Sequence, residues 1–369
     1  MSDSAPPPRP PAARHIVSFA QTLRGGGVER VLLRLAGGWV ERGRRVTLVV
    51  GDARGPLAAE LPAGVGVMAA GGGRYRDLLR AARGVGALSP DVIFCPGNHY
   101  TGVAAVARLS SAAPIVAKLS NALVGVHRPP VAWGYAAWLR LHPCFIDHLV
   151  TMSPAMAEQA ARAMAMPAER IDIIANPPAR NSTDASPIAL PPGRFILGVG
   201  RLAPQKRWDR LIAALPRLSD TTLALVILGE GAERATLAAL AERLGVAHRV
   251  HLPGHAADAA PAMRAAAVVA LTSDYEGVPG ALAEAIALGT PVVTTDSSVA
   301  IAELVPDRDT GSIVPRGDAN ALAAALERWL APNAERPVPH DGDRTDSIEA
   351  YLALFDRLIA GRAPPTRPA

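Results

Sequence analysis

The sequence predicts an α/β protein made of two Rossmann-like domains that face each other across a cleft. Short runs of β-branched residues alternate with longer Ala-, Leu- and Arg-rich stretches at helical spacing, and this alternation occurs twice along the chain. A segment rich in Pro, Ser and Asn, residues 176–193, separates the two series and is expected to be a linker. The length of 369 residues suits two or three domains.

The β-branched runs predict six strands in each half of the chain. The first six cover residues 15–20, 46–50, 92–95, 115–118, 148–152 and 171–174. The second six cover residues 195–199, 224–228, 250–252, 268–271, 291–294 and 313–314. The expected parts of the chain are therefore a disordered tail at 1–13, one domain at 14–180, a second at 181–345, and a final helix with a tail at 346–369.

Composition narrows the classes of function. Hydrophobic residues at 49% against 19% charged residues exclude a disordered protein. The net charge of +5 has no basic block, and aromatic residues are only 4%, so we expect an anionic small molecule or membrane surface and no nucleic acid. The cysteines Cys95 and Cys144 lack metal-ligand spacing, which favours a reducing compartment, the cytoplasm. The sequence contains no run of 18 consecutive apolar residues, so no transmembrane helix is predicted.

A glycine-rich loop, Q-T-L-R-G-G-G-V-E-R, follows the first expected strand and precedes an apolar helix. Glycines 25–27 would let the backbone approach an anion at the start of that helix, although a tight turn alone also explains them. The dinucleotide fingerprint G-x-G-x-x-G fails because Arg30 stands at its third position. Asp52, which ends the next strand, nevertheless keeps a nicotinamide-binding alternative open.

Two motifs in the second half place charged side chains at strand ends. In G-R-L-A-P-Q-K-R-W, Arg201 and Lys206 could neutralise a diphosphate, with solvated surface charges as the alternative. Trp208 is expected to pack on the sheet. In E-G-V-P-G-A-L-A-E, Glu276 and Glu284 flank a loop and the start of a helix. The amides at this helix start would face a phosphate, and the two carboxylates would accept hydrogen bonds from sugar hydroxyls. The amides concerned are those of Val278, Gly280 and Ala281.

At these motifs the chain resembles the family 4 glycosyltransferases, retaining enzymes of the GT-B fold with nucleotide-sugar donors. The resemblance runs from about residue 16 to 358 and rests on the G-G-V-E-R loop, the G-R-L-x-x-x-K segment, the L-G-E-G turn and the E-x7-E element followed by P-V-V. It implies a metal-independent, hexosyltransferase-type enzyme without a cofactor, with an acceptor domain first, a donor domain second and a last helix that crosses back to the first.

The resemblance also implies roles for individual residues. Gly26 and Gly27 would line the phosphate side of the cleft, and Arg201 and Lys206 would hold the diphosphate. Glu276, with Arg201 and Lys206, forms the expected catalytic set. The remaining donor contacts are expected from Glu284 at the ribose diol, from residues 251–254 including His251 and Gly254 at the nucleobase, and from Gly229, which gives the base room.

Acceptor contacts are expected in the first domain. Many family members carry a histidine after the fourth strand, where this chain has Ser120 and Asn121, so no general base is assigned. The weaker candidates for acceptor contact are Ser120 and Asn121 together with Asn98, His99 and His127. In the alternative interpretation the two histidines are structural or surface residues. Two D-x-D triplets, at 307–309 and 341–343, are interpreted as solvated turns, and no metal is predicted.

Residues 126–149 combine Trp133, Tyr135 and Trp138 with arginines and histidines, which suggests peripheral contact with the inner face of a membrane. A helix packed on the first sheet is the alternative. The predicted function is sugar transfer from a nucleotide-sugar donor, UDP-sugar before GDP-sugar, to a glycan or lipid-linked glycan, as in lipopolysaccharide or polysaccharide synthesis. The alternatives are an NAD-dependent oxidoreductase or epimerase, and a non-catalytic sugar-binding GT-B protein.

Overall fold

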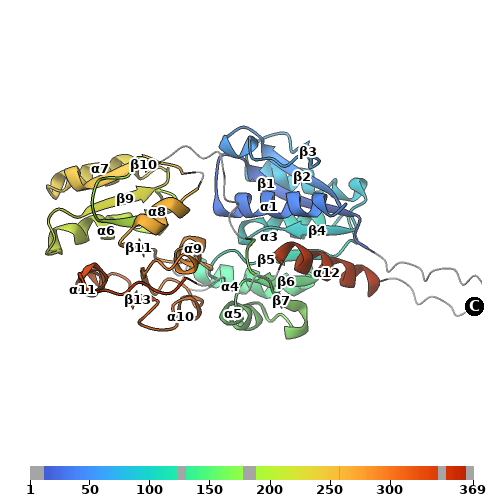
Figure 1. Cartoon of the computed structure of the whole chain (residues 1–369). Coiled ribbons are helices and arrows are strands. Elements are labelled where there is room, and N and C mark those ends of the chain that lie inside the picture. Colours follow the sequence, from blue (N-terminus) through green and yellow to red (C-terminus); the bar gives the residue numbers. More distant parts are fainter. Residues whose placement is uncertain (1–11, 124–129, 178–187, 257, 340–345, 363–369) are drawn as a thin grey trace, which may run out of the picture. The chain divides into compact units, whose positions relative to one another are not determined.

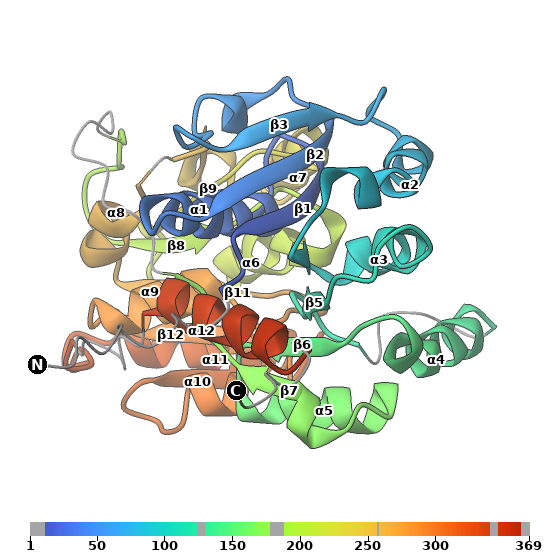
Figure 2. The same ribbon diagram turned by 90° about the vertical axis from the view of Figure 1, so that its right-hand side faces the viewer.

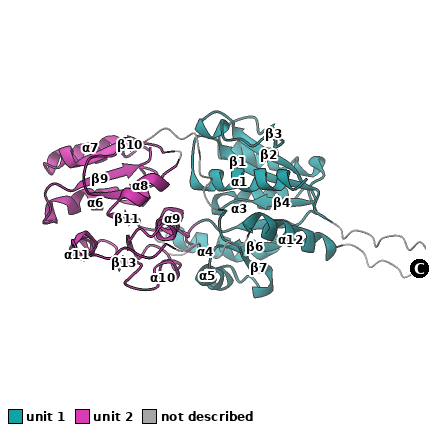
Figure 3. Ribbon diagram, in the orientation of Figure 1, with its two compact units in different colours: residues 1–120, 127–177, 345–369 teal, residues 121–126, 178–344 magenta. Residues whose placement is uncertain are grey.

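The structure is a computed structural model that describes residues 12–123, 130–177, 188–256, 258–339 and 346–362 (Figure 1). The chain forms two compact units, each with one parallel β-sheet (Figure 3). Unit 1 contains residues 1–120, 127–177 and 345–369, and unit 2 contains residues 121–126 and 178–344. The predicted pair of Rossmann-like domains is confirmed.

Unit 1 has a seven-stranded sheet in the order β3-β2-β1-β4-β5-β6-β7, in which every strand pair is parallel. Its strands are β1 His15–Thr22, β2 Arg45–Asp52, β3 Gly66–Ala69, β4 Val92–Cys95, β5 Ile115–Lys118, β6 His148–Thr151 and β7 Ile171–Ile173. Its helices are α1 Gly27–Glu41, α2 Tyr75–Ala82, α3 Thr101–Ala107, α4 Val131–Leu141, α5 Pro154–Met164 and α12 Ser347–Ala360.

Unit 2 has a six-stranded parallel sheet in the order β10-β9-β8-β11-β12-β13. Its strands are β8 Phe195–Val199, β9 Ala224–Leu228, β10 Val250–Gly254, β11 Val268–Leu271, β12 Val292–Thr295 and β13 Gly311–Val314. Its helices are α6 Trp208–Ala214, α7 Arg234–Arg243, α8 Ala260–Ala265, α9 Gly280–Ala287, α10 Ile301–Leu304 and α11 Ala319–Leu330.

All twelve predicted strands are present, with ends that differ by at most two residues. The central strands are apolar runs because both of their faces are buried, which is why the sequence identifies them. One strand, β3, was not predicted. It lies at the edge of its sheet, three of its four residues are exposed, and a short exposed strand between glycines carries no buried apolar run.

Helix α12 completes the core of unit 1. Its amino terminus is capped by Asp346, whose side chain accepts hydrogen bonds from the amides of Ile348 and Glu349 at 2.9 and 3.3 Å. The helix lies beside α1 (Figure 2) and buries Tyr351 and Phe355 at positions i and i+4, so both rings face the same side. These rings meet two more, Trp39 of α1 and Phe94 of β4, at centroid distances of 5.3 to 6.2 Å.

The beginning of the described chain is tied to the same helix. Ala13 is buried, its amide donates to Asp356 at 2.8 Å, and its carbonyl accepts a hydrogen bond from Arg44 at 3.1 Å. Arg44 also bonds Asp356 at 2.7 Å. The prediction of a tail through residue 13 is therefore wrong at Ala13, because α12 supplies a partner that the local sequence does not show.

Replacing Phe355 by Ala should lower the free energy of unfolding of unit 1 by about 3–5 kcal/mol, since it leaves a cavity among three other aromatic rings. Leu109→Ala removes an apolar side chain from the surface of the same unit and should change it by less than about 0.5 kcal/mol. Urea denaturation monitored by tryptophan fluorescence measures both; equal losses in the two variants would contradict this account of the core.

Candidate functional site

The strand order of each sheet reverses once. In parallel sheets this point is where ligands bind, beyond the carboxyl ends of the strands. In unit 2 the reversal lies between β8 and β11, and in unit 1 between β1 and β4. The predicted site residues in the loops after these strands can therefore be located on each unit separately.

In unit 2 the two reversal loops are joined by an ion pair. Lys206, at the end of a 3-10 turn after β8, donates from Nζ to Glu276 Oε1 at 2.7 Å. Ser273 Oγ donates to the same oxygen at 2.5 Å. Both charged side chains are largely buried, with 18% and 10% of the Lys206 and Glu276 side chains exposed. The structure thus brings together two of the three predicted catalytic residues, and it adds Ser273, which no motif indicated.

Further bonds fix these loops to each other. The amide of Asp274 donates to the carbonyl of Gln205 at 2.9 Å, and Gln205 Nε2 donates to the carbonyl of Tyr275 at 2.7 Å. Arg210 of α6 bonds the Asp274 carboxylate at 2.6 Å. Because these contacts hold both backbones, Lys206 and Glu276 meet in a defined geometry.

The third predicted residue, Arg201, lies in the same loop with an exposed side chain. Its carbonyl accepts a hydrogen bond from Trp208 Nε1 at 2.9 Å, which links the loop to α6. Trp208 is buried against Gly198 and Gly200, so its predicted packing on the sheet is confirmed. Arg201 is therefore positioned at the loop backbone while its guanidinium faces solvent.

Helix α9 starts at Gly280, as the sequence predicts. The amides of Gly280 and Ala281 are in its first turn, where no intrahelical acceptor exists, and no side chain of Pro279 caps them. Val278 is half-buried in the preceding loop. Glu284, also half-buried, is the fifth residue of this helix. The arrangement offers an anion-attracting helix start beside the Glu276 loop.

The glycines near β9 and β10 have a structural cause. A Cβ on Gly229, where φ is +158°, would be 1.9 Å from the carbonyl oxygen of Gly200. The amide of Gly229 donates to the carbonyl of Gly254 at 2.8 Å, and Gly254 itself has a φ of +97°. These glycines let three strand ends approach closely, whereas His251 is a half-buried residue within β10. Packing explains Gly229, and its expected contact with a base stays a prediction.

In unit 1 a second polar pair joins the end of β1 to the loop after β4. His99 Nε2 lies 2.7 Å from Gln21 Oε1, so this nitrogen carries the proton and Nδ1 is left as an acceptor. The ring packs on Tyr75 and Tyr100, at centroid distances of 4.6 and 5.4 Å. Burial removes water from the ring and lowers the pKa of His99, although the negative charge of Glu29 acts to raise it. His99 can therefore accept a proton or hydrogen bond near neutral pH.

The glycine loop is shaped by Glu29. A Cβ on Gly26, where φ is +157°, would be 2.1 Å from Glu29 Oε2, whereas one on Gly27 would meet nothing within 4 Å. Tyr100 donates its hydroxyl proton to Glu29 at 2.8 Å and accepts the amide of Gln21 at 3.0 Å. Gly26 is thus required by the fold of this loop, and Gly27 begins α1 with open space beside it.

Asn98 and Ser120 join the neighbouring loops after β4 and β5. Asn98 Oδ1 accepts a hydrogen bond from the amide of Ser120 at 2.8 Å, and the amide of Asn98 lies 3.4 Å from Ser120 Oγ. Asn121 accepts a hydrogen bond from the amide of Ala122 at 2.9 Å and belongs to the short segment grouped with unit 2. His127 lies outside the described residues. Asn98, Ser120 and His99 therefore lie along one edge of unit 1.

One residue at this edge was missed by sequence analysis. Lys118, the last residue of β5, is only 3% exposed, and its Nζ lies 3.2 Å from Met152 Sδ. No oxygen atom of the described residues accepts a hydrogen bond from it. Burial lowers the pKa of Lys118 to about 8. The composition could have drawn attention to this residue, because Lys118 and Lys206 are the only two lysines in the sequence.

Asp52 does not have the free carboxylate that a ribose-binding residue needs. Arg24 Nη2 lies 3.1 Å from Asp52 Oδ2, and Arg54 Nε lies 2.9 Å from Oδ1. The nicotinamide-binding alternative depended on this carboxylate, so the structure removes its main support.

The first D-x-D triplet, residues 307–309, is part of a turn. Asp307 closes a turn by accepting the amides of Asp309 and Thr310 at 3.1 and 2.8 Å, as the turn interpretation expects. The second triplet, 341–343, lies outside the described residues. Among the residues that are described, no three His, Cys, Asp or Glu side chains are grouped as metal ligands.

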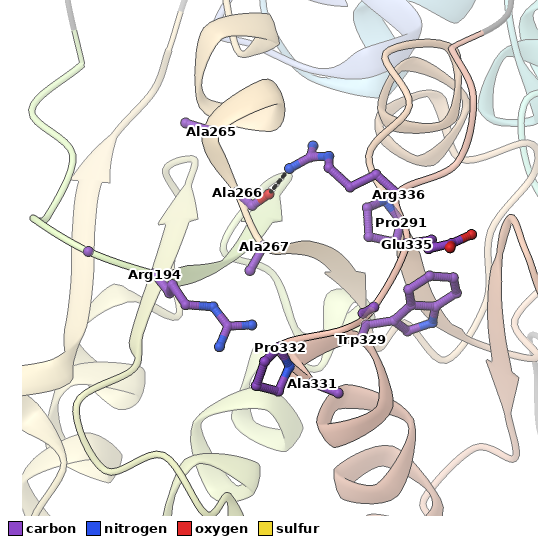
Figure 4. Close-up of a pocket in the computed structure, with 12 residues that line it drawn as sticks. Arg194, Ala265, Ala266, Ala267, Pro291, Trp329, Ala331, Pro332, Glu335 and Arg336 are labelled. Atoms are coloured by element: carbon purple, nitrogen blue, oxygen red, sulfur yellow. Dashed lines mark hydrogen bonds between the residues drawn. The ribbon is translucent and has the colours of Figure 1, made fainter.

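A cavity of about 490 Å³ lies at the other edge of the unit 2 sheet (Figure 4). Arg194, Ala267 and Pro291 line it and directly precede β8, β11 and β12. Arg336 crosses it to donate to the carbonyl of Ala266 at 3.0 Å, near the end of α8. None of the predicted site residues lines this cavity. Arg336 caps the carboxyl end of α8, which is a structural role.

The alternative interpretation of residues 126–149 is a helix packed on the first sheet, and the exposure of helix α4 does not agree with it. Only Leu139 of its residues is buried, while Trp133 is 72% and Val131 61% exposed. Trp138 stacks on Phe145 at 5.4 Å. None of the helices in the described part of the chain has the length and hydrophobicity needed to cross a bilayer.

Comparison with known proteins covers both units. Residues 26–177 match the family model described as "Glycosyl transferase 4-like domain", and residues 193–332 match "Glycosyl transferases group 1". Together the two models account for most of the chain.

Two relatives and one solved structure illustrate the similarity. The chain is 36% identical over 172 residues to "Lipopolysaccharide core biosynthesis glycosyltransferase LpsE" of Rhizobium meliloti, covering 45% of this chain and 50% of the relative. It is 36% identical over 137 residues, 37% of each chain, to the "N-acetylgalactosamine-N,N'-diacetylbacillosaminyl-diphospho-undecaprenol 4-alpha-N-acetylgalactosaminyltransferase" of Campylobacter jejuni. The matches therefore span half or less of these relatives. Anabaena Alr3699/HepE in complex with UDP and glucose superposes with a TM-score of 0.69 at 20% identity, over 95% of each chain, which indicates a shared fold.

The buried amine of Lys118 should make stability depend on pH. Its pKa of about 8 in the folded chain, below the ordinary 10.5, means that the unfolded chain binds more protons between these values. The free energy of unfolding should therefore rise through this window, by about 3 kcal/mol from this group. Lys118→Met should stabilise the protein at pH 7 by about 1–3 kcal/mol and abolish that rise.

Urea denaturation at pH 7 to 10.5 measures the difference between the two proteins. The difference is used because burial also raises the pKa of the Cys95 thiol to about 12, which lowers stability above pH 9 in both proteins. A difference that does not change with pH would contradict the burial of a titrating amine.

Proposed function

Because the chain belongs to the group 1 (family 4) glycosyltransferases and has their GT-B fold, we propose that it transfers a sugar from a nucleotide-sugar donor to a glycan or lipid-linked glycan. The observation that carries the proposal is the Lys206–Glu276 pair at the reversal of the unit 2 sheet. There, a cation that can bind phosphate is hydrogen-bonded to a carboxylate that can bind hydroxyl groups.

The donor site is proposed at the carboxyl edge of unit 2. Lys206, the exposed Arg201 and the amides at the start of α9 would bind the diphosphate, while Glu276 would accept hydrogen bonds from the sugar and Glu284 from the ribose. UDP is the proposed nucleotide and GDP the next. HepE, a protein of the same fold, binds UDP and glucose, which supports UDP as the first nucleotide to test.

The proposed reaction is retaining and needs no metal. The bond between the anomeric carbon and the diphosphate oxygen breaks as the acceptor oxygen bonds the same face of that carbon. The acceptor proton passes to the departing phosphate oxygen. Negative charge develops on the diphosphate, where Lys206, Arg201 and the α9 amides can stabilise it. His99, with its acceptor nitrogen, is proposed to orient the acceptor hydroxyl.

The acceptor is proposed to belong to lipopolysaccharide or polysaccharide synthesis. One relative is named for lipopolysaccharide core synthesis and another for an undecaprenol-linked acceptor, which supports this class. We further propose that α4 touches the inner face of a membrane, since Trp133 and Val131 are exposed and no acidic residue occurs in the helix.

Calorimetric titration of UDP, GDP, ADP and NAD without metal tests this function. UDP should bind, and Lys206→Met should weaken it about 10- to 100-fold because a charged hydrogen bond to phosphate is lost. Glu276→Gln should weaken a UDP-sugar relative to UDP, because only the sugar meets that carboxylate. Arg243→Gln removes an exposed cation from α7 of the same unit and should leave UDP binding unchanged.

Two other results would change the assignment. Binding of NAD alone would support the oxidoreductase alternative. The non-catalytic alternative would be supported if the protein binds a nucleoside diphosphate but neither transfers sugar to a glycan acceptor nor hydrolyses a nucleotide sugar.

A further inference from the structure

Three loops at the carboxyl edge of unit 1 form one continuous surface. The amide of Leu23, after β1, donates to the carbonyl of Asp52, at the end of β2, at 3.0 Å. Gln21 Nε2 donates to the carbonyl of Gly73, after β3, at 3.2 Å. A Cβ on Gly51 would lie 2.5 Å from the carbonyl oxygen of Gln21, so the backbones approach as closely as glycine allows. The side chains of these loops are therefore held in fixed relation.

A buried carboxylate beneath this surface holds two exposed guanidinium groups. Asp52 is 9% exposed, whereas the side chains of Arg24 and Arg54 are 70% and 89% exposed. Arg54 binds Asp52 through Nε at 2.9 Å and through Nη2 at 3.3 Å, and Arg24 binds it through Nη2 at 3.1 Å. These bonds hold the pKa of Asp52 well below its usual range, so the carboxylate is ionised at neutral pH.

The charges on this surface do not balance. The segments 21–26, 52–56 and 70–76 contain four arginines, at 24, 54, 74 and 76, but the single acidic residue Asp52. Asp77 in the first turn of α2 lies 3.9 Å from Arg76, and the Glu29 carboxylate borders Gly26. Even with these two negative charges, one positive charge remains in excess. One arginine would suffice to neutralise Asp52. The second arginine is not needed for this balance, and because its guanidinium is mostly exposed, solvent weakens its attraction to Asp52.

We propose that Arg24 and Arg54 bind a phosphate group carried by the acceptor. Arg24 Nε and Nη1 and Arg54 Nη1 make no bond to Asp52 and are available as donors. Donors from two loops suit the tetrahedral oxygens of phosphate, and Asp52 fixes both guanidinium groups in advance. Open space adjoins the backbone next to Arg24, since a Cβ on Gly25 would meet nothing within 4 Å. This inference rests on the proposed function, which supplies the acceptor.

Binding of two soluble probes tests the proposal. The protein is first saturated with UDP, so that phosphate cannot enter the donor site, and is then titrated with glucose 1-phosphate or with glucose by NMR. Glucose 1-phosphate should bind and glucose should not. Arg24→Gln and Arg54→Gln should each weaken binding of glucose 1-phosphate about tenfold. The triple variant R24Q/D52N/R54Q should abolish it without leaving a buried carboxylate unpaired.

A vesicle measurement distinguishes a soluble phosphate from a lipid headgroup. Sedimentation with phosphatidylglycerol vesicles, against phosphatidylcholine vesicles, is repeated on the same variants. If only vesicle binding depends on Arg24 and Arg54, the phosphate belongs to a lipid. The control is Arg162→Gln on α5, which removes a 74% exposed arginine from the same unit and should alter neither measurement.

Equal binding of the unmodified protein and the triple variant to glucose 1-phosphate and to both vesicles would overturn the proposal. Failure of the unmodified protein to bind any nucleoside diphosphate would instead count against the proposed function, so the two failures are distinguishable.

Discussion

Each sheet of this protein reverses its strand order once, and this reversal decides which polar side chains can meet. Loops from β8 and β11 meet through Lys206 and Glu276, which are 70 residues apart in the sequence. The end of β1 and the loop after β4 meet through Gln21 and His99, 78 residues apart. The same constraint therefore produces one polar bridge on each unit, each with a heavy-atom distance of 2.7 Å.

The two lysines of the chain show how differently a parallel sheet can treat a buried amine. Lys206 has a carboxylate partner, so its charge is compensated while both groups stay within reach of a ligand. Among the described residues, Lys118 has the Met152 thioether as its hydrogen-bond partner and no carboxylate, so its charged form is disfavoured. The first arrangement suits binding of an anion, whereas the second places a destabilising group at the edge where the acceptor is proposed to bind.

Sequence patterns located the strands because parallel strands buried on both faces are continuous apolar runs. They also located the glycine loop, the Lys206 segment and the Glu276 element, because such loops directly follow strand ends. They could not find Ser273 on Glu276, the burial of Lys118, or the attachment of Arg24 and Arg54 to Asp52, since these contacts depend on which loops become neighbours. Gly229 illustrates the same limit, because its requirement comes from the backbone of Gly200, 29 residues earlier.

The position of α12 has a consequence for how the chain is made. Strands β1 to β7 of unit 1 all precede unit 2 in the chain, yet the rings of Tyr351 and Phe355, which follow unit 2, fill the unit 1 core. In the described chain, the fully buried residues of the unit 2 core all lie between residues 195 and 330. During synthesis on the ribosome, unit 2 thus has its whole core before unit 1 receives its last helix. The unit that is begun first is the one finished last.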